Sequence, residues 1–129
     1  MGSTMEMHVG VIGLGTMGKT LTESLIAEEH AVAVWDRHPE KVATTGMIGA
    51  SPSVSARQVA EVSDIVFLAL PNADAVREVV LDPEVGVLAG LRAGSILIDM
   101  STASPDLAVE LSDAVTARGE GRRYVDAPV

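Results

Sequence analysis

Residues 8–18 read HVGVIGLGTMG, an apolar run followed at once by the pattern Gly-X-Gly-X-X-Gly. This order predicts a buried strand, a tight turn and a helix that begins beside the third glycine. Gly13 would let the chain turn, Gly15 would let the backbone approach a pyrophosphate, and Gly18 would let the helix pack closely on the strand. The helix N-terminus would then offer free N–H groups to the phosphates. The stretch therefore predicts a dinucleotide-binding turn.

The next apolar run, residues 31–35, is followed directly by Asp36 and Arg37. In a dinucleotide-binding fold, an acid at the end of the second strand accepts hydrogen bonds from the adenosine ribose. A carboxylate at Asp36 would repel a 2′-phosphate, whereas Arg37 could pair with one. We expect NAD rather than NADP, because the acid opposes the phosphate directly. NADP stays open, as does a plain turn or capping role for Asp36 before Pro39.

Five apolar runs alternate with helical segments along the chain. Runs rich in Val and Ile that do not alternate with polar residues are typical of strands buried on both faces of a parallel sheet. The predicted strands are residues 8–12, 31–35, 64–70, 95–99 and, more weakly, 124–125, and the predicted helices are 17–29, 39–45, 53–61, 72–80 and 105–117. The alternation predicts an α/β fold of Rossmann type, a doubly wound, mostly parallel sheet with helices on both faces.

The ends of these strands carry the candidate site. In doubly wound sheets, ligands bind at the edge formed by the carboxyl ends of the strands. Gly13, Asp36, Leu70 and Asp99 should lie along that edge. Leu70 and the following Pro71 could line the nicotinamide side, although a proline that merely ends a strand explains Pro71 equally well.

Helix-start signals accompany several of these segments. Ser104, Pro105 and Asp106 are the capping residue, the first helical residue and an acid suited to the helix dipole. The Ser-Pro-Ser stretch at residues 51–53 reads as a turn whose last serine caps the helix over 53–61.

Composition limits the possible partners. The 129 residues, 47% of them hydrophobic, suit one domain with a sizeable core. A formal net charge of −9 argues against nucleic acid or an anionic membrane as a partner. Cysteine is absent, which fits a reducing compartment, and we expect the cytoplasm. The three histidines are scattered, so we expect no metal site. Residues 1–7 read as a tag or flexible N-terminus, and residues 8–129 as the dinucleotide-binding domain.

A second informative stretch is DMSTASP at residues 99–105. The hydroxyls of Ser101 and Thr102 follow a strand that ends at the predicted ligand edge, so they could bind the carboxylate or hydroxyl of a substrate. Each could equally cap the helix that follows, and spacing alone favours capping.

Together with Asp-Ala-Pro-Val at residues 126–129, these stretches resemble the β-hydroxyacid dehydrogenase family, which includes 3-hydroxyisobutyrate dehydrogenase, tartronate semialdehyde reductase and 6-phosphogluconate dehydrogenase. The resemblance covers the chain from about residue 8 to residue 129. It implies the N-terminal cofactor domain of an enzyme that transfers a hydride between nicotinamide and a small 3-hydroxy acid or its semialdehyde. The implied cofactor-binding residues are Gly13, Leu14, Gly15, Thr16, Met17, Gly18, Asp36, Arg37, Leu70, Pro71, Ala75 and Thr102.

The resemblance also implies which residues contact the substrate and where the general acid/base lies. Ser101 and Thr102 are the implied substrate contacts. The family's general acid/base is a lysine in an all-helical second domain, and neither Lys19 nor Lys41 lies at a matching place. We expect that domain to be absent from these residues, so the chain should bind cofactor but turn over no substrate alone. The apolar surface expected near Val125 predicts a tendency to form homo-oligomers.

Three other functions stay open at this point. The chain could be a stand-alone module that binds or senses a nucleotide. It could be the cofactor domain of an imine reductase, although residues 101–105 and 126–128 favour hydroxy acids. An S-adenosylmethionine methyltransferase could also use a glycine-rich first turn, but it has no reason to carry the two later motifs.

Overall fold

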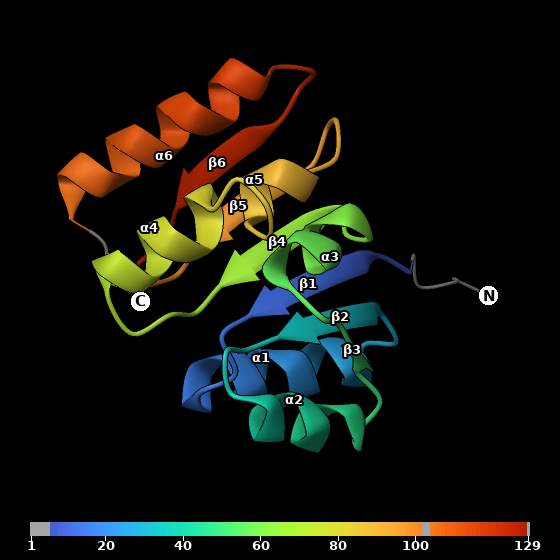
Figure 1. Ribbon diagram of the computed structural model, residues 1–129. Helices are drawn as coiled ribbons and strands as arrows, with labels where there is room; N and C mark the ends of the chain where they lie inside the picture. The colour runs from blue at the N-terminus through green and yellow to red at the C-terminus, as the bar shows by residue number, and fades with distance from the viewer. Residues whose placement is uncertain (1–5, 102–103, 129) are drawn as a thin grey trace.

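Six parallel strands form one sheet in a computed structural model that describes residues 6–101 and 104–128 (Figure 1). The strand order is β3-β2-β1-β4-β5-β6. The strands are β1 (His8–Ile12), β2 (Ala31–Trp35), β3 (Ser51–Pro52), β4 (Ile65–Leu68), β5 (Ile96–Asp99) and β6 (Arg123–Asp126). The chain starts in the middle of the sheet, runs to one edge, and crosses back to build the other half. This is the predicted doubly wound Rossmann topology.

Helices cover both faces of the sheet. They are α1 (Thr16–Ala27), α2 (Pro39–Gly46), α3 (Ala56–Glu61), α4 (Ala73–Leu81), α5 (Val87–Gly90) and α6 (Pro105–Arg118). In Figure 1, α1 and α2 lie together, away from α4 and α6. Among the described residues, no helix is long and apolar enough to cross a membrane.

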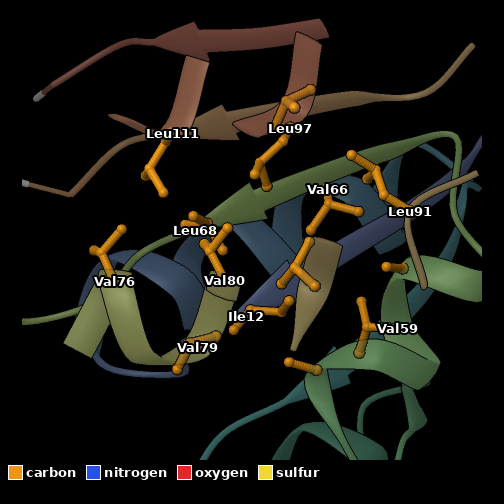
Figure 2. Packing of buried hydrophobic residues seen from close by; sticks show 14 of the residues in the cluster. Ile12, Val59, Val66, Leu68, Val76, Val79, Val80, Leu91, Leu97 and Leu111 are labelled. Carbon is orange, nitrogen blue, oxygen red and sulfur yellow. The ribbon is translucent and has the colours of Figure 1, made fainter. Parts of the chain in front are cut away.

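Two apolar clusters hold these layers together. Val11 and Ile12 are both fully buried, and because successive strand residues point to opposite faces, each belongs to a different cluster. The smaller cluster joins β1 and β2 to α1 and α2. Figure 2 shows the larger one, in which Leu68 and Leu97 of the sheet pack with Val76 of α4 and other helical side chains. The alternation of buried strands and helices thus produces the predicted three-layer core.

Two predictions near the sheet edge were wrong. Ser51 and Pro52 form no simple turn but a two-residue strand that pairs with β2. Proline lacks an N–H donor, and it is tolerated here because β3 is an edge strand. The N-cap of α3 is Ser55 rather than Ser53, and its side chain accepts a hydrogen bond from the N–H of Gln58 at 3.1 Å. The four-residue helix α5 was not predicted, because so short a segment leaves no periodic signal.

The predicted start of α6 is confirmed. The hydroxyl oxygen of Ser104 accepts a hydrogen bond from the N–H of Leu107 at 3.2 Å. Pro105 begins the helix and Asp106 lies in its first turn. The helix that begins at this cap packs against β6.

Candidate functional site

A groove of about 280 Å³ opens at the carboxyl ends of β1, β2 and β4. Ten of the twelve predicted cofactor residues line it: Gly13, Gly15, Thr16, Met17, Gly18, Asp36, Arg37, Leu70, Pro71 and Ala75. Of the other two, Leu14 is buried in the smaller apolar cluster, and Thr102 lies outside the described residues. The fold therefore brings together residues from three strand ends that lie far apart in the sequence.

The three glycines of the turn face different constraints. Gly13 has φ +98°, and a Cβ there would lie 2.2 Å from the backbone oxygen of Ala69. A Cβ at Gly18 would lie 1.8 Å from the backbone oxygen of Gly13. Both glycines are therefore required by the fold itself. A Cβ at Gly15 would meet no atom of residues 6–101 and 104–128 within 4 Å, so no packing among these residues explains that glycine.

The space in front of Gly15 suits an anion. Gly15 is the N-cap of α1 and has extended backbone angles that other residues can adopt. The first turn of α1 contains no acidic residue, so no carboxylate of the helix itself competes for its N–H groups or for the positive end of the helix dipole. The turn and the helix start together form a cradle for a phosphate or pyrophosphate.

The Asp36 carboxylate closes the turn from the side of β2. One oxygen accepts a hydrogen bond from the N–H of Leu14 at 2.7 Å, and the other from the N–H of His38 at 2.8 Å. The His38 ring nitrogen lies 3.0 Å from that second oxygen. Burial raises the pKa of Asp36, but these hydrogen bonds and the charge of Lys41 outweigh it, so the pKa lies below its ordinary value of 3.8. Asp36 is therefore ionised where the adenosine ribose would lie.

Basic side chains surround the same end of the groove. Arg37, His38 and Lys41 all line it beside Asp36. Arg37 lies 3.6 Å from the Glu78 carboxylate, and both side chains are more than half exposed. An exposed ion pair of this kind contributes little free energy, so Arg37 is able to turn toward a ligand. The electrostatics are mixed, as the sequence already indicated.

Leu70 and Pro71 form the wall at the other end of the groove. The N–H of Leu70 donates to the hydroxyl oxygen of Ser101 at 2.8 Å. Ser101 is only 1% exposed, so its hydroxyl lies behind the wall and already has a partner. The expected contact of Ser101 with a substrate stays a prediction, and the contact that the structure gives its hydroxyl is with the Leu70 N–H of the wall.

Behind Ser101 lies Asp99, which is fully buried. Its carboxylate accepts hydrogen bonds from the N–H of Ser101 at 2.9 Å and from the hydroxyl of Tyr124 at 3.2 Å. Burial raises the pKa of Asp99 above its ordinary value despite these bonds, and the charge of Asp126 adds to the effect. Burial also raises the pKa of Tyr124, as do the neighbouring carboxylates of Asp99 and Asp126. The sequence signal for this group is an aspartate that ends an otherwise apolar strand.

Metal ligands do not gather in the part of the chain that the structure describes. No three His, Asp or Glu side chains of residues 6–101 and 104–128 lie where they could hold a metal ion. The charged residues among the described groove lining are Asp36, Arg37 and Lys41, all at the ribose end. The arrangement can hold a dinucleotide, with its charged half at the turn and a flat apolar group against the Leu70 wall.

Comparison with known families gives a match over nearly the whole chain. Residues 8–129 match the family described as the NAD binding domain of 6-phosphogluconate dehydrogenase. The match begins with β1 and includes every residue that lines the groove.

Curated relatives carry several names. "Probable 3-hydroxyisobutyrate dehydrogenase-like 1, mitochondrial" of Arabidopsis thaliana is 40% identical over 121 residues, which are 94% of this chain and 36% of that protein. The 2-(hydroxymethyl)glutarate dehydrogenase of Eubacterium barkeri is 40% identical over 96% of this chain and 40% of its own length. The cytokine-like nuclear factor N-PAC of Danio rerio is 36% identical over 96% of this chain and 26% of its length. The chain spans two fifths or less of each.

Solved structures show the same fold and two cofactors. The 3-hydroxyisobutyrate dehydrogenase of Mycobacterium tuberculosis superposes with a TM-score of 0.85 at 30% identity, over 97% of this chain and 41% of that one. A V8 variant of the imine reductase of Myxococcus stipitatus, in complex with NAD+, superposes with a TM-score of 0.81 at 26% identity. The match covers 95% of this chain and 40% of that one. The imine reductase of that organism in complex with NADP+ superposes with a TM-score of 0.78 at 29% sequence identity. The match covers 92% of this chain and 39% of that one.

Proposed function

We propose that this chain, which belongs to the family of the NAD binding domain of 6-phosphogluconate dehydrogenase, is the cofactor-binding part of a hydroxyacid dehydrogenase. It holds a nicotinamide dinucleotide in the groove at the carboxyl ends of β1, β2 and β4. The observation that carries the proposal is Gly15, whose missing side chain leaves open space that no described residue fills. That space lies in front of the α1 N-terminus, where a pyrophosphate is favoured.

Different residues of the groove bind different parts of the cofactor. The backbone of the glycine turn and the start of α1 receive the pyrophosphate. Asp36 accepts hydrogen bonds from the adenosine ribose, and Ala75 and Val79 of α4 supply apolar surface beside it. Leu70 and Pro71 form the wall for the nicotinamide. The contact of Thr102 with the nicotinamide stays a prediction from the family resemblance.

The reaction proposed for the whole protein is hydride transfer with a small 3-hydroxy acid or its semialdehyde. The bound cofactor supplies or accepts the hydride. The names of the Arabidopsis and Eubacterium relatives support this substrate class. Among the described residues that line the groove, no titratable side chain stands at the Leu70 end. We therefore expect residues 1–129 alone to bind cofactor without turning over substrate, because a general acid/base is missing beside the nicotinamide.

We further propose NAD as the preferred cofactor. The Asp36 side chain is only 9% exposed, and its lowered pKa keeps it charged at neutral pH. A 2′-phosphate would have to lie beside this anion, whereas two ribose hydroxyls can donate to it. Arg37, His38 and Lys41 oppose this preference, so we expect a modest selectivity rather than an absolute one.

A direct titration tests the proposal. NADH added to the purified chain should give saturable nicotinamide fluorescence with a dissociation constant in the micromolar range or weaker, and NADPH should bind less tightly. Absence of saturable binding by either cofactor at millimolar concentration would overturn the proposal. Equal or tighter binding of NADPH would overturn only the preference for NAD. Self-association, measured by sedimentation over a wide concentration range, tests the predicted tendency to form homo-oligomers.

A second candidate function is imine reduction, favoured by the structural neighbours named imine reductases. Such an enzyme would use the same cofactor groove and differ in the residues that receive the substrate. Assays of the whole protein with a cyclic imine and with 3-hydroxyisobutyrate, each at saturating cofactor, distinguish the two. The third candidate, a stand-alone nucleotide-binding module, predicts cofactor binding with neither activity.

A further inference from the structure

We propose that Asp99, Ser101 and Tyr124 are positioning residues for the cofactor groove. They hold the Leu70–Pro71 wall in place and tie it to the end of β6. The proposal rests on the proposed function, since it assumes that the groove binds a dinucleotide. It concerns side chains that do not line the groove and therefore act on the cofactor only through the backbone of Leu70.

The first step is the loss of sheet support beyond β4. The N–H of Ala69 still donates to the backbone oxygen of Ile12 at 2.9 Å, which continues the pairing with β1. One residue later the strand has ended, and the N–H of Leu70 donates to a side chain, the Ser101 hydroxyl, at 2.8 Å. The groove wall is therefore held by one serine from a segment 31 residues away rather than by the sheet ladder.

The second step is that Ser101 is itself held in place by a hydrogen bond to Asp99. Asp99 is fully buried, and each of its two carboxylate oxygens receives a different donor. One donor is the N–H of Ser101 and the other is the Tyr124 hydroxyl on β6. A buried carboxylate is costly, and an apolar residue would pack there with less penalty. Two acceptor oxygens on one planar group are what allow Asp99 to orient Ser101 and β6 at once.

The third step connects this group to the phosphate turn. A Cβ at Gly13 would lie 2.2 Å from the backbone oxygen of Ala69, so the turn and the start of the wall touch backbone to backbone. On the other side, the N–H of Ala127 donates to the backbone oxygen of Asp99 at 2.9 Å. A shift of Leu70 would therefore move one wall of the groove relative to the turn, and the segment after β6 is linked to the same group.

The test compares two buried serines at opposite ends of β5. Ser101→Ala removes the acceptor of the Leu70 N–H. We expect the dissociation constant for NADH to rise about tenfold, the equivalent of one hydrogen bond. The amide hydrogen of Leu70 should exchange faster than in the parent chain. Ser95→Ala is the matched control, because Ser95 is 2% exposed and its hydroxyl donates to the Arg92 backbone oxygen at the far end of the strand.

In the control, we expect Ser95→Ala to lower the denaturation midpoint but to leave both NADH affinity and Leu70 exchange unchanged. Tyr124→Phe removes only the more distant donor, and NADH affinity should fall about threefold, consistent with part of one hydrogen bond. If Ser101→Ala does not fold, the NADH affinity of Tyr124→Phe tests the proposal instead. Parent-like NADH affinity in the folded Ser101→Ala chain, or in Tyr124→Phe when it alone folds, would overturn the proposal. Failure of the parent chain to bind NADH would instead overturn the proposed function.

Discussion

The two ends of the groove are built in different ways. At the phosphate end, residues 13–18 take their shape from backbone sterics, with carbonyl oxygens packed where Gly13 and Gly18 have no side chain. At the nicotinamide end, the wall is held by side chains that belong to β5 and β6. The first end depends on backbone contacts, one of them between Gly13 and the distant Ala69, and the second on hydrogen bonds between side chains that only the fold brings together. Substitutions at the two ends should therefore have different signatures.

The largest expected effect is a loss of stability at Gly18. Gly18→Ala places a Cβ 1.8 Å from the backbone oxygen of Gly13, and backbone cannot move aside as a flexible side chain can. We expect the free energy of unfolding to fall by about 3 kcal/mol. Chemical denaturation followed by circular dichroism measures it. A variant as stable as the parent would show that the turn is not set by this backbone contact.

Gly15→Ala tests the same turn with the fold left intact. A Cβ at Gly15 meets nothing within 4 Å, and its backbone angles suit alanine, so stability should change by less than about 1 kcal/mol. The methyl group would enter the space proposed for the pyrophosphate, and NADH affinity should fall at least about tenfold, or 1.4 kcal/mol. Calorimetric titration measures the affinity. Undiminished binding would show that the ligand does not approach this backbone.

Asp36→Asn tests the side chain that ties the turn to β2. The lowered pKa of Asp36 means that its charge stabilises the fold above pH 3.8 and that this contribution is lost as the pH falls through the lower folded value. We expect a loss of about 1 kcal/mol at pH 7, which shrinks in strong acid. The ratio of NADPH to NADH affinity should rise about fivefold, because the anion beside the ribose is gone. An unchanged ratio in paired titrations would remove Asp36 from cofactor selection.

Asp99→Asn gives the smallest effect at neutral pH and the opposite pH dependence. The pKa of Asp99 is raised, so its contribution to stability is fully present below the unfolded pKa and is lost as the pH rises through the folded value. Asparagine keeps the shape without titrating, and stability at pH 7 should change by about 1 kcal/mol or less. As the pH is lowered from 7 to 4, the denaturation midpoint of the parent should rise relative to that of Asp99→Asn. Parallel profiles would contradict the assigned burial.

Most of the groove could be predicted because its signals are local. The glycine spacing, the acid after the second apolar run and the proline after β4 each lie at the end of a recognisable strand, and parallel strands bring such ends to one edge. The predictions failed where a segment was too short to show a pattern, or where two residues were equally suited to one position. Ser53 and Ser55 are both good caps, and only the packing of α3 selects the second. A two-residue strand such as β3 has no periodicity to detect.

The sequence by itself determined the doubly wound sheet, the phosphate turn and the position of Asp36, because these depend on residue types with strong local preferences. Tertiary structure alone decided the burial and the hydrogen-bond partner of Ser101. In the sequence it is a hydroxyl at a strand end that could bind a substrate or cap the following helix, and spacing alone favours the cap. In the fold it is 1% exposed and bonded to Leu70, because β4 and β5 run side by side and end at the same level. Burial and partners across strands are properties of the packed sheet, and no local pattern contains them.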